Sequence, residues 1–341
     1  MSPIAPVLAP LFAEIGQLTE RWGRRVDVQA LGVTDRQGHL PLGPAGLQSP
    51  NGACRLIEAA DGWIALNLAR DEDWDLVPAW LGLEFGATGW PEIEIAVRSR
   101  PRGGLVETAA LLGLPVAAVG ELVCDETRAP RLRQGLGANG LRKSPIRAID
   151  LSALWGGPLC GGVLAAMGAA VTKVESVRRP DPTRTSTPDF FRRLNGQKSE
   201  LRLDLTASAD LERLKDEILI ADVLITSARP RAFGALGLEP DEVFAANPGL
   251  VWVAITGYGW TAGPARVAFG DDAAAAGGLV QWTEQGAPRF LGDALADPIT
   301  GLVGAVGALK ALAEGGGVIV DAALARCAAG AASALRLRRA A

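Results

Sequence analysis

The chain has 341 residues, of which 48% are hydrophobic and 21% charged, a balance that allows a substantial buried core and one or two domains. Its formal net charge of −4 and the absence of a basic stripe exclude nucleic-acid binding by counterion release. One histidine and four cysteines leave almost no material for Ser-His-Asp, Cys-His or His-rich metal chemistry, so no metal is expected.

The four cysteines are widely spaced and contain no CxxC pair. Cysteine often acts as a small apolar residue, so we expect Cys54, Cys124, Cys160 and Cys327 to be buried free thiols. The histidine, His39, stands in the polar stretch DRQGHLPLG and is interpreted as a loop residue rather than a catalyst.

Neither the N-terminus nor the apolar tracts predict a targeting or membrane segment. The first residues lack a basic region and reach Glu14 early, which is not typical of a signal peptide. The Ala- and Leu-rich tract from Gly301 is interrupted by Lys310 and Glu314, which argues against a membrane span. We therefore expect a cytoplasmic protein without membrane contact.

Residues 1–124 are predicted to form a small α+β domain. A helical pattern covers Ala5–Trp22. Residues 55–69 predict a hairpin of two strands that turns at Asp61-Gly62, a preferred hairpin dipeptide. Residues 106–122 then predict a helix followed by a short strand.

The composition changes after residue 124. Residues 125–145 are basic and Gly-rich and end at Pro145, as expected of a linker. Residues 146–341 then alternate apolar strands with helices, which predicts a large domain with a Rossmann-like parallel α/β sheet that binds ligands at the carboxyl ends of its strands. Strands are expected at 146–152, 170–176, 221–227 and 250–259, helices at 163–169, 207–219 and 240–246, and a tight loop at 156–162.

The stretch IDLSALWGGPLCGGVLAAMGAAVTKVE has a strand, a Gly-Pro loop, a helix ending in Gly-Ala and a second strand ending in Lys-x-Glu. It resembles the opening of family III CoA-transferases, the group that includes carnitine, bile-acid, formyl and succinyl transferases. The segments DPTR, NGQKSELRLDL, ADVLITSARP, NPGLVWVAITGYGWTAGP and ADPITGLVGAVGALKAL follow in the family's order. The resemblance implies an enzyme that moves CoA from an acyl-CoA to a free carboxylic acid without ATP or a metal.

The resemblance also implies the catalytic group. In the family, an Asp nucleophile stands four residues before a Gly that begins the helix ending in a GILAAL-like run. Here Asp297 stands four residues before Gly301, and the helix ends with GALKAL, whereas Asp293 has a different spacing and is less favoured. Pro298 suits a first helical turn, where the helix dipole stabilises a carboxylate. Without the resemblance, Asp297 would be interpreted as a capping residue.

Several residues are candidates for binding CoA. A helix after the Gly156-Gly157-Pro158 loop would offer free N–H groups to phosphate, although a plain strand–helix turn fits equally well. Lys198 and Arg184 could meet the phosphates or be solvated surface charges. The positions that match the family's CoA-lining residues are Trp155, Gly156, Ser176, Leu203 and Ser227, with Arg229 in an element, Ser227 to Arg231, that lacks the family's Asn and aromatic residue.

Two other functions remain open. The family also contains α-methylacyl-CoA racemases, which carry Gly-His-Asp where this chain has Gly270-Asp271-Asp272. Two-base racemisation loses one base without that histidine, so the sequence favours a transferase. The third reading is a non-catalytic CoA-binding subunit, suggested by the altered element around Arg229 and by the order of the domains.

The order of the segments differs from that of ordinary family members, in which the α/β half comes first. Here SPNGACRLIEAADGWIALNLARDEDW and LLGLPVAAV, which resemble small-domain elements, precede it. This order predicts a circular permutation with Pro145 near the usual N-terminus, or alternatively a fusion with a remnant of an upstream gene copy. Family members form interlocked dimers, so we expect a homodimer, although permutation would remove one connection of the interlocking ring.

Overall fold

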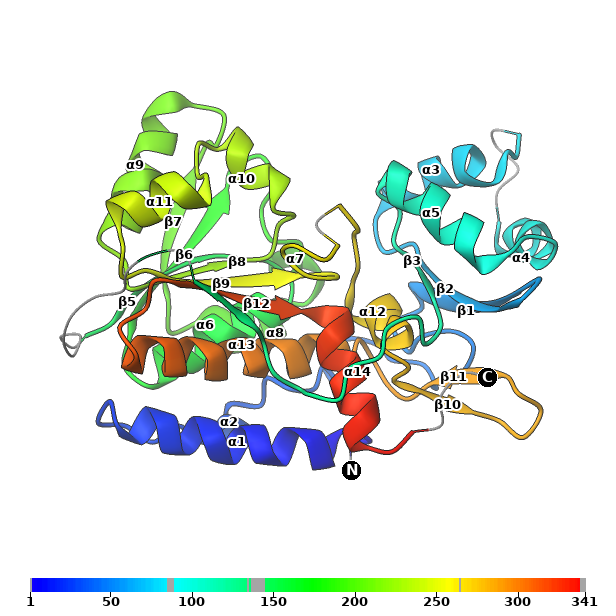
Figure 1. Cartoon of the computed structure of the whole chain (residues 1–341), viewed down its shortest axis with the longest axis horizontal. Coiled ribbons are helices and arrows are strands. Elements are labelled where there is room, and N and C mark those ends of the chain that lie inside the picture. Colours follow the sequence, from blue (N-terminus) through cyan, green and yellow to red (C-terminus); the bar gives the residue numbers. More distant parts are fainter. Residues whose placement is uncertain (1, 85–88, 134, 136–144, 264, 338–341) are drawn as a thin grey trace.

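The computed structural model describes residues 2–84, 89–133, 135, 145–263 and 265–337, which form a large and a small lobe (Figure 1). The large lobe contains a seven-stranded sheet in the order β4-β12-β9-β8-β5-β6-β7, parallel except for β4. Its strands are β4 (Arg131–Arg133), β5 (Arg147–Leu151), β6 (Ala170–Ser176), β7 (Ser199–Leu203), β8 (Val223–Thr226), β9 (Val251–Thr256) and β12 (Val318–Ala323). The predicted parallel α/β sheet is confirmed.

The chain winds outward in both directions from the centre of this sheet. From β5 it proceeds to β6 and β7 on one side, and then from β8 to β9 and β12 on the other. This doubly wound order leaves a crevice between the carboxyl ends of β5 and β8, where folds of this kind bind their ligands. The loops after Leu151 and Thr226 therefore define the expected binding edge.

Helices cover both faces of the sheet (Figure 1). One face carries α6, α8 and α13, and the opposite face carries α9, α10 and α11. Successive side chains of a strand point to opposite faces of the sheet. Val253 of β9 accordingly packs in the core on the α13 face, and its neighbour Trp252 packs in the core on the α11 face. The helices of this lobe are α6 (Gly156–Ala166), α7 (Thr183–Ser186), α8 (Pro188–Asn195), α9 (Ser208–Leu219), α10 (Arg231–Ala235), α11 (Pro240–Ala246), α12 (Gly270–Ala276), α13 (Ala296–Ala313) and α14 (Leu324–Ala334).

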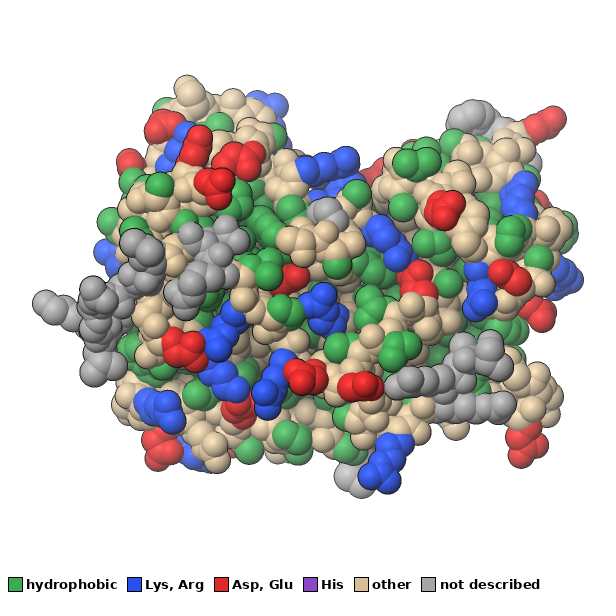
Figure 2. Space-filling model, in the orientation of Figure 1, with side chains coloured by type: hydrophobic (Ala, Val, Ile, Leu, Met, Phe, Trp, Pro, Cys, Tyr) green, Lys and Arg blue, Asp and Glu red, His purple; other side chains and the backbone are tan. Residues whose placement is uncertain are grey.

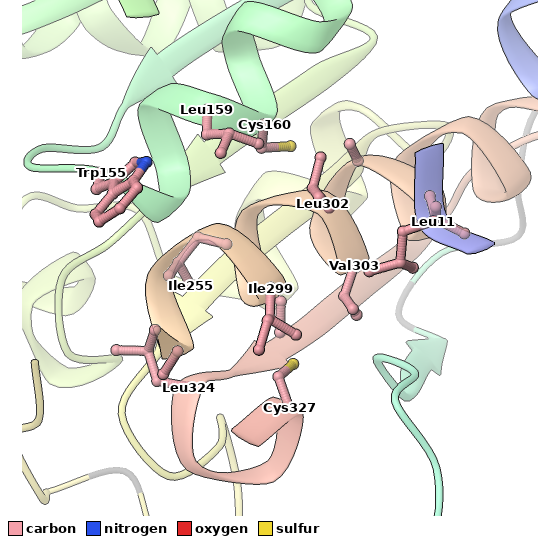
Figure 3. Close-up of a cluster of buried hydrophobic side chains, with 14 of the residues drawn as sticks. Leu11, Trp155, Leu159, Cys160, Ile255, Ile299, Leu302, Val303, Leu324 and Cys327 are labelled. Atoms are coloured by element: carbon pink, nitrogen blue, oxygen red, sulfur yellow. The ribbon is translucent and has the colours of Figure 1, made fainter. Parts of the chain in front are cut away.

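Helix α13 is the central element of the large lobe's core. Figure 3 shows its Ile299, Leu302 and Val303 within an apolar cluster that also includes Leu159 of α6 and Leu324 of α14. By length and composition α13 could cross a membrane, but most of it is buried inside the protein, as in the core helix of a globular fold. Its nearly uniform apolar surface therefore reflects contacts on every side.

The small lobe is a three-stranded antiparallel sheet covered by three helices. The predicted hairpin is confirmed: β1 (Cys54–Ala59) pairs with β2 (Gly62–Asn67), and β3 (Val116–Ala118) joins β2. Ala59 pairs with Gly62, so the turn is Ala60-Asp61, one residue earlier than predicted. The covering helices are α3 (Asp71–Leu81), α4 (Trp90–Arg98) and α5 (Arg102–Leu112). A third hydrophobic cluster, separate from those of the large lobe, lies between sheet and helices.

The N-terminal helix belongs to the large lobe, whereas residues 47–49 already pair with β1, so the predicted small domain 1–124 is wrong at its N-terminal end. Helix α1 (Ala5–Glu20) packs along α13, with Leu11 near Val303 (Figure 3), because its stripe of Val7, Leu8, Leu11 and Ile15 is buried in the large core. The predicted linker 125–145 also contributes β4 to the large sheet. Its residues 134 and 136–144 lie outside the described part. The remaining elements are α2 (Val28–Leu31), β10 (Val280–Trp282) and β11 (Pro288–Phe290).

Residues 156–162 are helical, which corrects the predicted tight loop. Helix α6 begins at Gly156, and its glycines are sites of close contact rather than turn residues. A Cβ at Gly157 would collide with the Ser152 side chain, and one at Gly162 would lie 3.0 Å from the Leu194 carbonyl. The small residues therefore let α6 approach its neighbours closely.

The closest approach of α6 and α13 occurs at Gly301. A Cβ there would lie 2.5 Å from the backbone carbonyl of Gly156, which is well below a normal contact distance. Gly301 is one helical turn after Asp297, on the same face of α13. The Asp-to-Gly spacing seen in the sequence thus allows Asp297 to reach the N-terminus of α6.

We predict that Gly301→Ala will destabilise the protein by about 1–3 kcal/mol, because backbone atoms of α6 must move to accept the methyl group. The free energy of unfolding in urea measures this change. Gly104→Ala in α5 is the matched control, since a Cβ there meets nothing within 4 Å and a helical Gly-to-Ala change should be neutral or slightly stabilising. Equal stabilities for the two variants would contradict a tight α6–α13 contact.

Candidate active site

Asp297 lies where the N-termini of two helices meet. It occupies the first turn of α13, and its carboxylate lies against Gly156, the first residue of α6, since a Cβ placed on Gly156 would be 3.5 Å from Asp297 Oδ1. The side chain is partly exposed. Free N–H groups of α6 and the positive ends of both helix dipoles thus surround one carboxylate.

The pKa of Asp297 is about 7, well above that of an ordinary Asp. Burial is the largest cause, because it disfavours the charged form; Asp271 and Asp293 raise the pKa further, while Arg36 and the Gly156 N–H lower it. The dipole stabilisation expected from the sequence is therefore outweighed by desolvation. Near neutral pH, Asp297 exists in both protonated and ionised forms.

Arg36 and Asn51 connect the neighbouring carboxylates. The Arg36 guanidinium donates two hydrogen bonds to Asp293, of 2.8 and 2.7 Å, and its plane lies over the Trp155 ring. The Asn51 amide donates to Asp293 at 2.8 Å and to Asp271 at 2.6 Å. Asp293 is thus held in a bidentate ion pair, whereas Asp297 has no direct ion pair in the described part of the chain.

The turn that carries Asp297 is fixed by backbone contacts. Ala294 has the left-handed φ of 45°, which is unfavourable for a residue with a Cβ. Its N–H donates to Asp271 at 2.7 Å, and its carbonyl accepts from the Asp297 N–H at 3.0 Å. The strained turn is therefore stabilised by the same carboxylates that surround the site.

Asp272 and Asn67 form an unusual buried pair between α12 and β2. The Asn67 amide donates to Asp272 Oδ1 at 2.9 Å, but Asp272 Oδ2 and Asn67 Oδ1 are both buried and both lack a partner. Two acceptor oxygens can be satisfied together if Asp272 carries a proton and donates it. Burial raises the pKa of Asp272 to about 7, in agreement with a neutral acid. Asp271 is also buried, with a pKa of about 6.

A cavity of about 690 Å³ opens beside these carboxylates. Its walls include Trp155, Asp293 and Leu295, and most of the remainder comes from the segment 34–45 before β1. His39 lies in this segment, with its ring against Phe190, and makes no side-chain hydrogen bond in the described structure. The segment that precedes the small lobe thus forms a wall next to the candidate nucleophile.

The positions expected to line CoA are distributed unevenly. Trp155 is buried, and its indole N–H donates to the Val33 carbonyl at 2.8 Å. Gly156 and Gly157 are buried in the first turn of α6. Ser176 and Leu203 end the neighbouring strands β6 and β7, at the carboxyl edge of the sheet. Leu203 is almost fully buried.

Lys198 and Arg184 both form ion pairs with carboxylates of the same chain. The Lys198 ammonium is fully buried and donates to Asp150 at 2.7 Å, to the Pro158 carbonyl at 2.8 Å and to Asn195 at 2.8 Å. We therefore assign Lys198 to the fold, where it supports α6 from below, rather than to phosphate binding.

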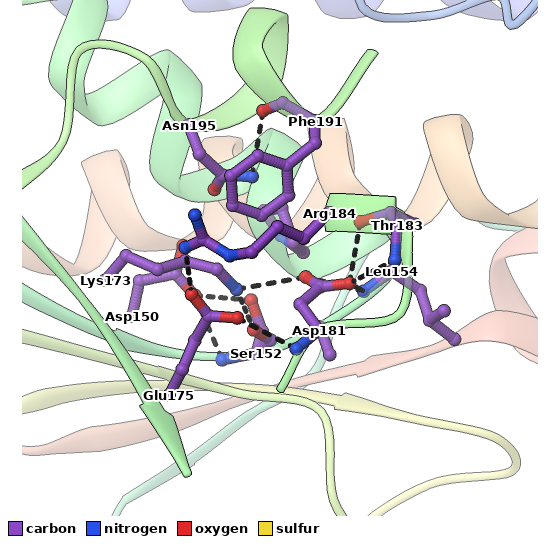
Figure 4. Close-up of polar contacts among 12 residues, drawn as sticks. Asp150, Ser152, Leu154, Lys173, Glu175, Asp181, Thr183, Arg184, Phe191 and Asn195 are labelled. Carbon is purple, nitrogen blue, oxygen red and sulfur yellow. Dashed lines mark hydrogen bonds and ion pairs between the residues drawn. The ribbon is translucent and has the colours of Figure 1, made fainter. Parts of the chain in front are cut away.

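Arg184 belongs to a neighbouring polar network (Figure 4). It pairs with Glu175 and Glu200 and stacks on Phe191. In the same network Lys173 pairs with Asp181 at 3.1 Å, and Asp181 accepts the Leu154 N–H at 3.2 Å. This network shapes the loop that leads into α6.

Arg229 is more available than Lys198 and Arg184 for binding an external anion. Ser227, just before it, is exposed, and its hydroxyl accepts the Ala153 N–H at 2.9 Å across the β5–β8 crevice. A cavity of about 320 Å³ between the lobes brings Arg229 together with Arg231 and Arg70. Arg229 and Arg231 make no side-chain hydrogen bond or ion pair within the described residues. Burial and these two like charges lower the pKa of Arg229, and Figure 2 shows basic side chains at the notch between the lobes.

Sequence reasoning did not identify Arg36, Asn51, Asn67 or Arg70. Arg36 lies outside the segments that resemble the family, and Asn51, Asn67 and Arg70 lie in the stretch that resembles small-domain elements, where no motif marks them as site residues. Only the packing of residues 33–67 against the large lobe brings three of them to the carboxylate cluster. The cysteines mostly agree with expectation: all are free, and Cys54, Cys160 and Cys327 are buried, but Cys124 is partly exposed.

Comparison with known proteins gives a consistent picture. Residues 144–336 match the profile of CoA-transferase family III. The chain is 36% identical over 202 residues to an acyl-CoA transferase of Fusarium pseudograminearum, covering 52% of this chain and 44% of that protein. It is 31% identical over 191 residues to succinyl-CoA–D-citramalate CoA-transferase of Chloroflexus aurantiacus, covering 52% and 47%. The chain thus spans about half the length of the curated relatives it matches.

A solved structure is similar in both fold and sequence. The crystal structure of a CAIB/BAIF family protein from Brucella suis aligns with a TM-score of 0.51 and 27% identity, over 55% of this chain and 54% of that one.

We predict that Asp272→Asn will make the protein more stable at alkaline pH. The folded-state pKa of Asp272, about 7, lies above the unfolded value, so its contribution to stability is present at low pH and is lost as the pH rises through 7. An Asn can accept the Asn67 N–H as Asp272 does and can offer an N–H to the partnerless Asn67 Oδ1, without ionising. At pH 8 the free energy of unfolding should exceed that of wild type by on the order of 3–4 kcal/mol.

Denaturant unfolding at pH 5 and pH 8 tests this expectation, with Asp216→Asn on exposed α9 as the control. A variant whose stability falls between pH 5 and 8 as steeply as that of wild type would exclude a buried neutral Asp272.

Proposed function

The chain belongs to CoA-transferase family III, and we propose that it transfers CoA from an acyl-CoA thioester to a free carboxylic acid with Asp297 as the nucleophile. The observation that carries this proposal is the position of Asp297 at the meeting point of two helix N-termini, with its carboxylate against Gly156. A carboxylate with a pKa near neutrality is ionised often enough to attack, and its desolvation increases its nucleophilicity.

The proposed reaction consists of two exchanges. The Asp297 carboxylate attacks the donor thioester carbonyl and expels CoA thiolate, which gives a mixed anhydride. The thiolate then attacks the aspartyl carbonyl, so that the donor acid leaves and CoA remains on Asp297 as a thioester. The acceptor carboxylate attacks this thioester and expels the thiolate again. Attack of the thiolate on the acceptor carbonyl of the second anhydride releases the new acyl-CoA and restores Asp297.

Backbone donors support each of these steps. Every attack produces a tetrahedral oxyanion next to Asp297, and the free N–H groups at the start of α6 begin at Gly156, against which the carboxylate lies. These groups belong to a rigid helix that is packed on α13, so no reorganisation is needed when the charge forms. The species on the two sides of each exchange are of similar energy, so the reaction needs no ATP.

The nucleotide part of CoA is assigned to the carboxyl edge of the sheet and the notch between the lobes. The β5–β8 crevice with Ser227 leads from the start of α6 toward the cavity with Arg229, Arg231 and Arg70. Phosphate groups match guanidinium donors in charge and geometry. The lack of internal partners for Arg229 and Arg231 supports a role in binding an external anion.

The acyl groups are assigned to the cavity of about 690 Å³ beside Asp293 and Trp155. A space of this size admits substantial organic acids. One relative is named as acting on succinyl-CoA and D-citramalate, and another on succinyl-CoA and glutarate. We therefore place dicarboxylic acids first in a panel of donors and acceptors, whose products can be identified by mass spectrometry.

The proposed assembly is a homodimer of permuted chains. The matched region begins at residue 144, and the small lobe formed by residues 54–118 precedes it, in agreement with the permutation inferred from the sequence. We also propose a cytoplasmic location, where acyl-CoA substrates are present. Sedimentation analysis measures the number of chains in the assembly.

Racemisation of an α-methylacyl-CoA is the alternative activity, and exchange of the α-proton in deuterated water without an acceptor acid would favour it. Asp271 and Asp272 are both buried and hydrogen-bonded to asparagines of the N-terminal segment and the small lobe. These contacts make them less suited to abstract a proton from a substrate than an open imidazole–carboxylate pair.

We predict that Asp297→Asn will lower the rate of transfer by about a thousandfold or more, since the amide cannot form the anhydride. Hydroxylamine should trap an aspartyl hydroxamate in wild type incubated with acyl-CoA, and peptide mass spectrometry should locate it at residue 297. Asp293→Asn removes the less favoured carboxylate and should still give the hydroxamate at residue 297, at a reduced rate because the ion pair of Asp293 with Arg36 is lost. Full transfer by the Asp297→Asn variant would exclude this residue as the nucleophile.

We predict that Arg229→Met will raise the KM for acyl-CoA about tenfold or more with little effect on kcat, because one charge-assisted contact to phosphate is lost. The double variant Arg229→Met with Arg231→Met should weaken binding further and reduce its dependence on salt concentration. Arg98→Met at the C-terminal end of α4 serves as the control. An unchanged KM in the double variant would place the nucleotide elsewhere.

A further inference from the structure

Arg36 is anchored beside the candidate nucleophile although it stands more than 100 residues before the family-matched region. Its guanidinium lies 4.8 Å from the centre of the Trp155 ring, directly before the first residue of α6. The Trp155 indole N–H donates to the carbonyl of Val33, three residues before Arg36. A ring contact and a hydrogen bond to one side chain thus fix the segment that carries the guanidinium.

Through Asp293, Arg36 also holds the turn that bears Asp297. Two hydrogen bonds from Arg36 orient the Asp293 carboxylate, and the Arg36 side chain is only 17% exposed in this ion pair. Asp293 begins the turn whose second residue, Ala294, has a left-handed φ and accepts the Asp297 N–H. Because such a turn is strained, a firm hold at one end is needed to keep Asp297 in place.

The charges around Asp297 come from three elements. Asp271 on α12 and Asp293 in the turn are negative, and Arg36 from the N-terminal segment is the one cation that acts on Asp297 in the described part of the chain. Helix α6 contributes the uncharged Gly156 N–H, and Asn51 is a neutral bridge between Asp271 and Asp293. Without the guanidinium, three carboxylates would face one another in a desolvated space.

We propose that Arg36 is a positioning residue for the transfer reaction: it holds Asp293 and thereby the turn of Asp297, and its positive charge keeps the Asp297 carboxylate ionised for attack. This inference rests on the proposed function of Asp297. The ion pair with Asp293 gives the arrangement a further use. When Asp297 becomes a neutral anhydride or thioester, Arg36 retains a counter-charge and is not left as an unpaired buried cation.

The pH dependence of kcat/KM tests the charge. Transfer needs ionised Asp297, so activity falls as the pH drops through its pKa. Arg36→Met should move this acid limb upward by about 1–2 pH units, as expected when an opposite charge is removed from a carboxylate. Arg36→Lys keeps the charge but not the two-pronged geometry, so its acid limb should stay near that of wild type while kcat falls. Arg25→Met, on the exposed surface of the same segment, is the control.

A second comparison removes the effect of leaving Asp293 unpaired and covers the case in which Arg36→Met alone does not fold. Asp293→Asn and the double variant Arg36→Met with Asp293→Asn differ only in Arg36, and the double variant should have the higher acid limb. Identical limbs in this pair, or wild-type kcat in Arg36→Lys together with an unmoved limb in Arg36→Met, would overturn the proposal for Arg36. Absence of transfer in wild type across the acid panel would instead overturn the proposed function.

Discussion

The contact between the N-terminal turns of α6 and α13 is the constraint on which the site depends. Gly301 lets the two helices approach until a single additional carbon atom would collide with the Gly156 carbonyl. At that separation the Asp297 carboxylate, one turn earlier on α13, lies against Gly156 at the start of α6. Helix α13 packs against α6, against the sheet and, on its outer side, against α1. These contacts fix the position of Asp297, four residues before Gly301.

Burial makes this position useful and also creates an electrostatic problem. Asp271, Asp293 and Asp297 lie close together where water is scarce, and desolvation raises the pKa of Asp271 and Asp297 toward neutrality. Helix dipoles reduce this effect but do not outweigh it. Arg36 forms an ion pair with Asp293, and the neutral Asn51 amide bridges Asp271 and Asp293. Asp272 accepts a hydrogen bond from Asn67, an arrangement that suits a neutral acid. The small lobe and the N-terminal segment therefore contribute contacts to the carboxylate cluster of the large lobe.

Much of the fold could be predicted, because its elements follow local periodicity. Four strands of the large sheet (β5, β6, β8 and β9), the hairpin of β1 and β2 and the helix α1 lie close to their predicted positions. Two predictions failed for tertiary reasons. Helix α1 joined the large lobe because its apolar stripe matches the surface of α13, and residues 156–162 formed a helix because close packing, rather than a turn, requires their glycines. Propensity alone cannot distinguish these two uses of glycine.

The sequence by itself determined the family and the parallel α/β sheet and favoured Asp297 over Asp293 as the candidate nucleophile, since each depends on spacing along the chain. Tertiary structure alone decided which charges act on Asp297. Lys198, a candidate phosphate ligand in the sequence, became a buried support of α6, whereas Arg36 and Arg70, unmarked by any motif, reached the two cavities. The physical reason is that the role of a charge is set by its neighbours and its exposure to water, and these come from segments hundreds of residues apart.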